Sequence, residues 1–242
     1  MTLPLVTCVM LTTVPRRNRF LPDALRSFRA QSYPAKELVI VNDGEPIRSA
    51  ATDIRVVNLP DIRRKWTIGE KRNVGVREAR GTFIATWDDD DISLPERLAR
   101  QVEYALRCDA SVVLADRMIV ADEDMNLIGT CHRGKQRPVQ ASALLERDAI
   151  VAVGGYPAVS YREDAATHER IRYYGRGCVV VMPDCDFYIM RRHGSNVTLD
   201  AGEANDDYVQ CALNDPRGRR LGRAVEELRA LDVAHEIEGI EA

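Results

Sequence analysis

The first hundred residues alternate between two patterns of hydrophobic and polar positions. One is a short, continuous run of apolar and β-branched residues, as in residues 5–11, which is typical of a strand covered on both faces. The other places apolar residues at every third or fourth position, as in residues 19–31, and predicts an amphipathic helix. Together the two patterns predict strands at 5–11, 37–41, 54–59 and 83–87, and helices at 19–31, at 68–80 and in a third segment that ends near 107.

Cap residues delimit two of these helices. Thr67 and Glu70 have the spacing of a capping box, so a helix is predicted to follow Thr67 and to end at Gly81. Ser93 and Glu96 repeat that spacing and predict the start of the helix that ends near 107. Strands that alternate with helices predict a mostly parallel sheet, whose ligands bind beyond the carboxyl ends of the strands.

The second half of the chain is less regular. Its patterns predict strands at 111–121, 126–131, 178–182 and 187–191, a helix at 163–174, and helical or mixed structure at 138–153. From Pro216 onward an amphipathic helix is predicted, because apolar residues recur on one of its faces. That face carries Leu221, Val225, Leu228 and Leu231. No repeat or linker interrupts the chain, which indicates one domain with a terminal appendage.

Composition narrows the class of protein. The 242 residues include 34 basic and 37 acidic side chains, a net charge of −3 that disfavours a strongly basic surface for duplex nucleic acid. None of the six cysteines has C-x-x-C spacing, so free thiols in a reducing, cytoplasmic compartment are expected. The apolar start is short and lacks a basic flank, which predicts a buried strand rather than a signal peptide. No run reaches the roughly 18 uncharged residues of a membrane helix.

Four consecutive aspartates, Asp88–Asp91, follow the predicted strand 83–87 directly. Carboxylates this close repel one another, and a divalent cation relieves the repulsion. Oxygen ligands of this kind suit Mg²⁺ or Mn²⁺, which commonly combine one or two carboxylates with the phosphates of a substrate. The alternative is a solvated acidic turn. Asp43 lies in a similar place, because it follows the strand at 37–41, and the two strand ends predict a ligand site between them.

Three further candidates have both a functional and a structural interpretation. Glu163 and Asp164 begin a predicted helix, where acidic residues also complement the helix dipole. His193 follows a predicted strand, and there it is either a metal ligand or a surface residue. Arg72 and the neighbouring Asn73 lie early in a capped helix, either in a binding site or on a solvated basic face.

The order of these motifs resembles that of family 2 glycosyltransferases with the GT-A fold. The resemblance covers roughly residues 3–200. It includes VTCVMLTT, KELVIVNDG, the block GEKRNVGVREARGTFIATWDDDDISLPERL, the glycine pair Gly154-Gly155, the acidic motif Arg162-Glu163-Asp164, and FYIMRRHGSN. It implies an α/β fold: a Rossmann-like, mostly parallel sheet flanked by helices, a small second antiparallel sheet, and a C-terminal helix.

The resemblance also implies how the chain is organised. Residues 1–200 would form a single GT-A domain, with 1–107 as the nucleotide-binding half and 108–200 as the acceptor side. Residues 201–242 would form a helical appendage, through which a homodimer could assemble. The expected donor is a nucleotide sugar, with a UDP-sugar favoured. The acceptor stays open among a glycan, a lipid-linked sugar, a protein, a small molecule and a nucleic acid.

The resemblance assigns roles to the candidate residues. Asp90 and His193 would bind Mn²⁺ or Mg²⁺ against the donor diphosphate. Asp164 would be the general base that deprotonates the acceptor, and Glu163 would orient the acceptor or the sugar. The reaction would invert the anomeric centre. The nucleotide-binding residues would be Thr13, Asp43, Arg72, Asp88 and Asp89.

Two departures from the family pattern leave the nucleotide base open. The segment Thr12–Arg16 lacks the usual aromatic residue and asparagine, and Asn42-Asp43-Gly44-Glu45 replaces D-D-G-S. No Q-x-x-R-W motif is present, which favours transfer of single sugars. A sugar-1-phosphate nucleotidyltransferase is one alternative, but residues 12–19 contain no glycine. A binding module without turnover is another, and the intact Asp164 argues against it.

Overall fold

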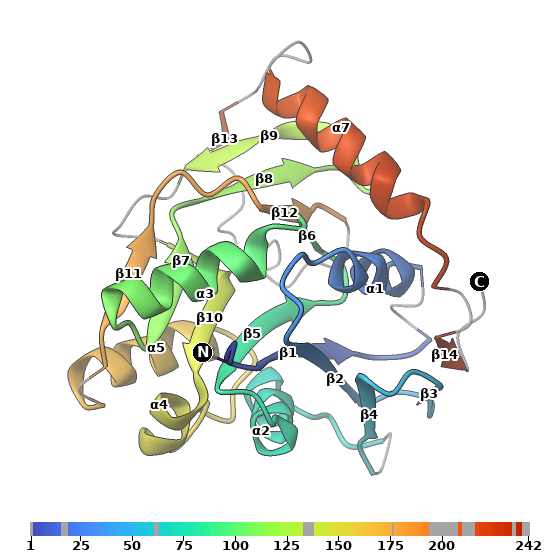
Figure 1. Ribbon diagram of the computed structural model, residues 1–242. Coiled ribbons are helices and arrows are strands. Elements are labelled where there is room, and N and C mark those ends of the chain that lie inside the picture. Colours follow the sequence, from blue (N-terminus) through green and yellow to red (C-terminus); the bar gives the residue numbers. More distant parts are fainter. Residues whose placement is uncertain are drawn as a thin grey trace.

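A computed structural model describes residues 2–15, 19–60, 63–132, 138–175, 177–193, 208–209, 216–233 and 236–238. Its centre is a seven-stranded sheet with helices on both faces (Figure 1). The neighbouring strands β4, β2, β1 and β5 are all parallel, and β10 is antiparallel to both β5 and β7. The strands, in order across the sheet, are β11 (Val179–Met182), β7 (Val112–Ala115), β10 (Val139–Glu146), β5 (Phe83–Asp88), β1 (Val6–Thr12), β2 (Lys36–Asn42) and β4 (Ile54–Asn58).

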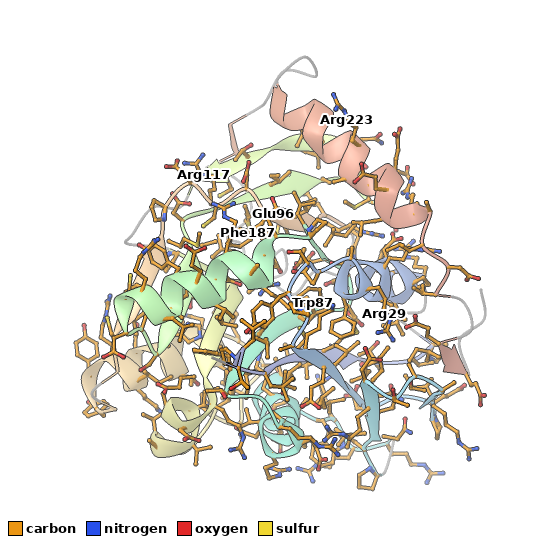
Figure 2. The ribbon with its side chains drawn as sticks, viewed as in Figure 1. Arg29, Trp87, Glu96, Arg117, Phe187 and Arg223 are labelled. Carbon is orange, nitrogen blue, oxygen red and sulfur yellow. The ribbon has the colours of Figure 1, made fainter. Side chains whose placement is uncertain are left out.

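The helices form two layers because the sheet strands are apolar on both faces. In β1, Cys8 and Met10 pack on one face with α1 and α3, while Val9 packs on the other with α2. Trp87 of β5 fills the first layer and donates from its indole Nε1 to the carbonyl of Ala24, 3.1 Å away (Figure 2). The helices are α1 (Leu21–Arg29), α2 (Ile68–Glu78), α3 (Arg97–Cys108), α4 (Arg147–Ala152), α5 (Glu163–Tyr173) and α7 (Pro216–Arg229).

A second sheet lies beside α3 and under α7 (Figure 1). Its pairings are antiparallel except that of β12 with β8. The strands β3 (Arg48–Ser49) and β14 (Ile237–Glu238) form a separate pair. The expected fold class is therefore confirmed: a large, mostly parallel sheet with a small, mostly antiparallel one. In order across it, the strands of the second sheet are β13 (Tyr208–Val209), β9 (Leu127–His132), β8 (Arg117–Ala121), β12 (Tyr188–Arg191) and β6 (Ile92–Ser93).

One predicted cap is wrong. Ser93 does not cap α3, because it lies in β6, and the helix begins at Arg97 after Glu96, which makes no side-chain cap bond. The Ser93 hydroxyl instead accepts from the buried Arg97 guanidinium at 2.7 Å. Tertiary pairing of β6 with β12 therefore overrides the local signal at Ser93.

The mixed segment 138–153 resolves into β10 followed by α4.

The other capping box is present. The Thr67 hydroxyl accepts from the Glu70 amide, and the Glu70 carboxylate accepts from the Thr67 amide. We expect Thr67→Ala to lower the stability of the protein by about 1 kcal/mol, since the Glu70 amide loses the hydroxyl that accepts its hydrogen bond at the helix start. A melting temperature lower by roughly 2–4 °C would be the measured effect. Thr67→Ser keeps the hydroxyl and is the matched control, and equal melting of all three proteins would contradict the role.

The C-terminal helix α7 packs on its own chain. Val225 and Leu228 are buried in the main core, whereas Leu231 keeps 37% of its surface exposed, and Leu221 lies outside the described side chains. The Arg26 guanidinium donates to the Leu231 carbonyl at 2.9 Å, which ties the end of α7 to α1. A homodimer through this helix stays a prediction and would have to use its outer side. In the described part of the chain, no helix is both long and apolar enough to span a bilayer.

Candidate active site

The candidate site lies where β1, β2 and β5 end. Thr12 pairs with Asn42 in register, and Leu11 pairs with Asp88, so the three carboxyl ends lie side by side. The sequence pattern predicted Asp43 and Asp88–Asp91 at these ends, and the structure brings them to one edge of the sheet. Parallel pairing is the physical reason, because it aligns the ends of strands that are far apart in sequence.

Asp43 is presented by a tightly bonded turn. The Thr13 hydroxyl donates to Asp43 Oδ1 at 2.5 Å, and Lys71 Nζ of α2 donates to the same oxygen at 3.1 Å. Asn42 shapes the turn, since its Oδ1 accepts from the amides of Val14 and Gly44. A Cβ on Gly44 would lie 2.0 Å from the Val14 carbonyl oxygen, so only glycine fits there. Thr13 and Asp43 therefore meet as expected, and Lys71 is an addition that the sequence patterns did not reveal.

A buried tyrosine connects two carboxylates of the acidic turn. The Tyr188 hydroxyl lies 3.0 Å from Asp88 Oδ2 and 2.5 Å from Asp91 Oδ2. Burial raises the pKa of Asp91 well above its usual range, and repulsion from Asp90 and Asp88 adds to the rise. Burial also raises the pKa of Asp88, although the charge of Arg72 lowers it. A phenol has one proton to donate, so it cannot satisfy two carboxylates at once. The turn therefore favours a proton, or a cation, over full ionisation.

Asp90 and His193 form the pair that the resemblance assigned to a metal. His193 Nε2 lies 3.0 Å from Asp90 Oδ2, both side chains are buried, and the Phe20 ring stacks against the imidazole with centroids 4.6 Å apart. Asp89 is buried in the same turn. Among the described residues no group of three or more histidines, cysteines and acids could hold a metal ion. The carboxylate and the imidazole are groups that could share a Mg²⁺ or Mn²⁺ ion with substrate phosphates, as Mg²⁺ sites commonly do.

An ion pair joins the two halves of the site. Arg72 Nε of α2 donates to Glu163 Oε1 of α5 at 3.0 Å, and both side chains are buried. Burial alone would lower the pKa of Arg72, but the charges of Asp88, Glu163 and Asp164 raise it above its usual value. Burial raises the pKa of Glu163 despite Arg72. Both pKa values are raised at a place where several acids surround a single guanidinium. The acids together raise the pKa of Arg72, whereas Arg72 does not offset the burial of Glu163.

Asp164 stands next to this pair in the first turn of α5, as predicted. It is half-buried, and its Oδ1 accepts from the Ala165 amide at 2.6 Å. Arg162 before it has a left-handed backbone, with φ of 57°, which turns the chain into the helix. Asn73, by contrast, is structural: its side-chain amide bonds both the amide and the carbonyl of Tyr156. A Cβ on Gly155, the second glycine of the predicted loop, would lie 2.4 Å from Asn73 Oδ1.

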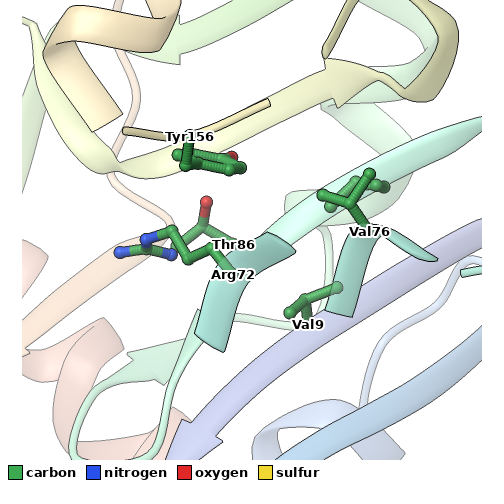
Figure 3. A pocket seen from close by; sticks show the side chains of 6 residues that line it. Val9, Arg72, Val76, Thr86 and Tyr156 are labelled. Atoms are coloured by element: carbon green, nitrogen blue, oxygen red, sulfur yellow. The ribbon is translucent and has the colours of Figure 1, made fainter. Parts of the chain in front are cut away.

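A small cavity lies behind Arg72 (Figure 3). Its volume of about 10 Å³ is about that of one water probe and far too small for a sugar. Burial raises the pKa of Tyr156 to about 12, so its hydroxyl stays protonated. Sequence reasoning missed Tyr156 and Tyr188, because an aromatic residue in a loop or strand carries no signal for the acids that it meets in space. The cavity is lined by Val9, Arg72, Val76, Ile84, Thr86 and Tyr156.

Comparison with known proteins gives the family of the chain. Residues 9–130 match the sequence profile of glycosyl transferase family 2. The amylovoran biosynthesis glycosyltransferase AmsE of Erwinia amylovora is 25% identical over 182 residues, which cover 68% of each protein. An uncharacterized glycosyltransferase of Methanocaldococcus jannaschii, MJ1057, is 33% identical over 108 residues, which are 42% of this chain and 37% of that protein. The chain thus spans only about a third of the length of some relatives.

Solved structures share the fold. TarS 1-349 of S. aureus in complex with UDP-GlcNAc superposes with a TM-score of 0.62 at 15% identity, covering 96% of this chain and 69% of that one. The mannosyltransferase PcManGT of Pyrobaculum calidifontis, in complex with GDP-Man and Mn²⁺, gives 0.58 at 16% identity, over 95% and 71%. The strand-end acids lie in a GT-A glycosyltransferase fold. The chain belongs to glycosyl transferase family 2.

Proposed function

We propose that this protein is a metal-dependent, inverting glycosyltransferase that moves a sugar from a nucleotide-diphosphate sugar, with a UDP-sugar favoured, to an acceptor hydroxyl. One observation carries the proposal: the Asp90–His193 pair and the Arg72–Glu163 pair lie around the same carboxyl end of β5. The first pair suits a metal on the donor diphosphate. The second joins the donor half to the acidic motif that faces the acceptor.

The donor would bind across the ends of β1, β2 and β5. Thr13 and Asp43, held together by a 2.5 Å hydrogen bond, would contact the base, and Arg72 with Asp88 and Asp89 would hold the ribose and phosphates. The complexes of TarS with UDP-GlcNAc and of PcManGT with GDP-Man support a nucleotide-sugar donor. Lys71 beside Asp43 adds a positive charge to the base side of the site.

Asp90 and His193 would hold Mn²⁺ or Mg²⁺. The chemistry of the turn fits a cation, since burial and then the charges of Asp90 and Asp88 raise the pKa of Asp91. The Mn²⁺ in the PcManGT complex agrees with this choice. When bound, such an ion would offset the charge of the diphosphate leaving group as a Lewis acid.

Asp164 would act on the acceptor. Its carboxylate would take the proton of the acceptor hydroxyl as the acceptor oxygen bonds to the anomeric carbon and the bond from that carbon to the diphosphate oxygen breaks. Attack from the face opposite the leaving group inverts the anomeric centre. Glu163, fixed by Arg72, would orient the acceptor or the sugar. A positioned base supplies roughly 10²–10⁴-fold of rate.

A nucleotide-sugar panel tests the proposal. UDP- and GDP-sugars are screened for a thermal shift and for release of the nucleoside diphosphate, each with and without Mn²⁺. We expect a Mn²⁺-dependent shift and slow nucleoside diphosphate release into water for at least one donor. A sugar-1-phosphate nucleotidyltransferase would instead release pyrophosphate from a nucleoside triphosphate. Binding without any release would support a module that lacks turnover.

The role of His193 can be tested separately. We expect His193→Ala to weaken Mn²⁺ affinity by about tenfold or more, because neutral imidazole is a direct ligand in the proposed site. Isothermal titration of Mn²⁺ in the presence of UDP measures the change. Melting without metal is the control, since His193 is also packed against Phe20. An unchanged Mn²⁺ affinity with a lower melting temperature would leave His193 a packing role only.

A further inference from the structure

A buried histidine lies behind the acidic motif. His168 of α5 is four residues beyond Asp164 and only 4% exposed. Its Nδ1 lies 2.5 Å from Oε1 of Gln140, which reaches it from β10. A carbonyl oxygen can only accept, so Nδ1 carries the ring proton and Nε2 keeps a free lone pair. That Nε2 is buried and makes no hydrogen bond to any described residue.

Helix geometry brings the His168 ring to the turn of α5 that carries Asp164. Helical side chains point toward the N-terminus, so residue i+4 covers the turn that carries residue i. The groups that act on the imidazole agree with this placement. Burial lowers its pKa to about 4, the Asp164 charge raises it, and Arg72 of α2 lowers it further; Gln140 of β10 is neutral. The ring is therefore neutral at physiological pH, and Asp164 is the acid whose charge acts on it.

Buried polar atoms without partners are rare because they cost free energy. The unprotonated Nε2 of His168 can gain a hydrogen bond when a donor forms beside it during the reaction. Asp164 has no proton to donate while it is ionised, and its Oδ1 then accepts from the Ala165 amide. After it has taken a proton, the same carboxyl group becomes a donor.

We propose that His168 is a positioning residue for Asp164: its Nε2 accepts a hydrogen bond from the Asp164 carboxylic acid after Asp164 has taken the acceptor proton. The inference rests on the proposed function, since it needs Asp164 as the base. The proton stays on Asp164 until it leaves for solvent with product release, and no bond other than the hydrogen bond forms or breaks at His168. Gln140 fixes the tautomer by holding the proton on Nδ1.

Two substitutions of His168 test the roles of its two ring nitrogens separately. His168→Asn keeps an amide donor near the position of Nδ1 and removes Nε2. His168→Gln places an amide group near the position of Nε2 and can replace it as the acceptor. The exposed Glu169 on the same helix provides a control as Glu169→Gln. The assay is release of nucleoside diphosphate from the most active donor of the panel, with water as acceptor and Mn²⁺ present, between pH 5 and 9.

We expect His168→Asn to lower kcat about tenfold with donor KM within twofold, and His168→Gln to retain most of kcat. In an Asp164→Asn background, His168→Asn should have no additional effect, because the two residues act through one proton. Equal kcat for His168→Asn and the wild type, equal losses in both His168 variants, or an additive loss in the Asp164→Asn background would overturn the proposal.

A spectroscopic measurement keeps the inference separate from the proposed function. Long-range ¹H–¹⁵N spectra of the wild type should show His168 protonated at Nδ1 and unprotonated at Nε2, unchanged from pH 8 to 5. A proton on Nε2 would overturn the inference whatever the activity. If no donor of the panel releases its nucleoside diphosphate in the wild type, the proposed function fails. The base role of Asp164, on which the role of His168 depends, then fails as well, even if the His168 tautomer is as expected.

Discussion

Asp90→Ala is expected to abolish the effect of Mn²⁺ on nucleoside diphosphate binding and to remove turnover. Asp90 is the carboxylate of the acidic turn whose Oδ2 faces the His193 imidazole at 3.0 Å. Mg²⁺ and Mn²⁺ sites completed by phosphates rely on one or two protein carboxylates, so the loss of one removes most of the protein's share. Titration of UDP and GDP with and without Mn²⁺ measures the effect.

The fold should survive this substitution. The charge of Asp90 raises the pKa of both Asp88 and Asp91, so its removal relieves repulsion within a buried turn. We therefore expect the melting temperature of the metal-free protein to stay level or to rise. Asp148→Ala, which removes a carboxylate that is 91% exposed on α4, is the matched control and should leave nucleotide binding unchanged. Mn²⁺-dependent binding that persists in Asp90→Ala would move the metal to another acid of the turn.

Strand ends are the part of the site that sequence patterns predict best. A buried strand has a short apolar run with a sharp end, so the pattern alone suffices to assign Asp43 and Asp88 to carboxyl ends of strands. Their proximity follows from parallel pairing, with Leu11 opposite Asp88 and Thr12 opposite Asn42. Local rules also suffice for Thr67 and Glu70, because a capping box lies within one turn of a helix.

Local sequence patterns do not predict contacts between elements that are distant in the sequence. Arg72 and Glu163 are 91 residues apart and meet only because α2 and α5 pack together on one face of the sheet. The bond from Tyr188 to Asp91 likewise depends on the pairing of β12 with β6, because a local pattern can predict a strand but not its partner. Ser93 shows the opposite case: the capping prediction was wrong, because pairing of β6 with β12 stabilises a strand where the local pattern predicts a cap.

Asp164→Asn is expected to leave donor and metal binding near wild-type levels and to reduce transfer by on the order of 10²-fold or more. Asparagine has the same size, and its carbonyl oxygen can still accept from the Ala165 amide, but it cannot take a proton from the acceptor. Glu169→Gln, on the exposed side of the same helix, is the control for loss of one negative charge. Both variants are compared for Mn²⁺-dependent UDP binding and for nucleoside diphosphate release.

Measuring both UDP binding and nucleoside diphosphate release shows whether Asp164 is a catalytic base or a structural acid. A residue that only complements the dipole at the start of α5 would change the melting temperature and little else, since its charge contributes a few tenths to about 1 kcal/mol. A base changes kcat while binding is preserved. If Asp164→Asn turns over at the wild-type rate, the assignment moves to Glu163. Glu163 is buried, burial raises its pKa, and its carboxylate accepts a hydrogen bond from Arg72, so it is the next acid of the site to test as the base.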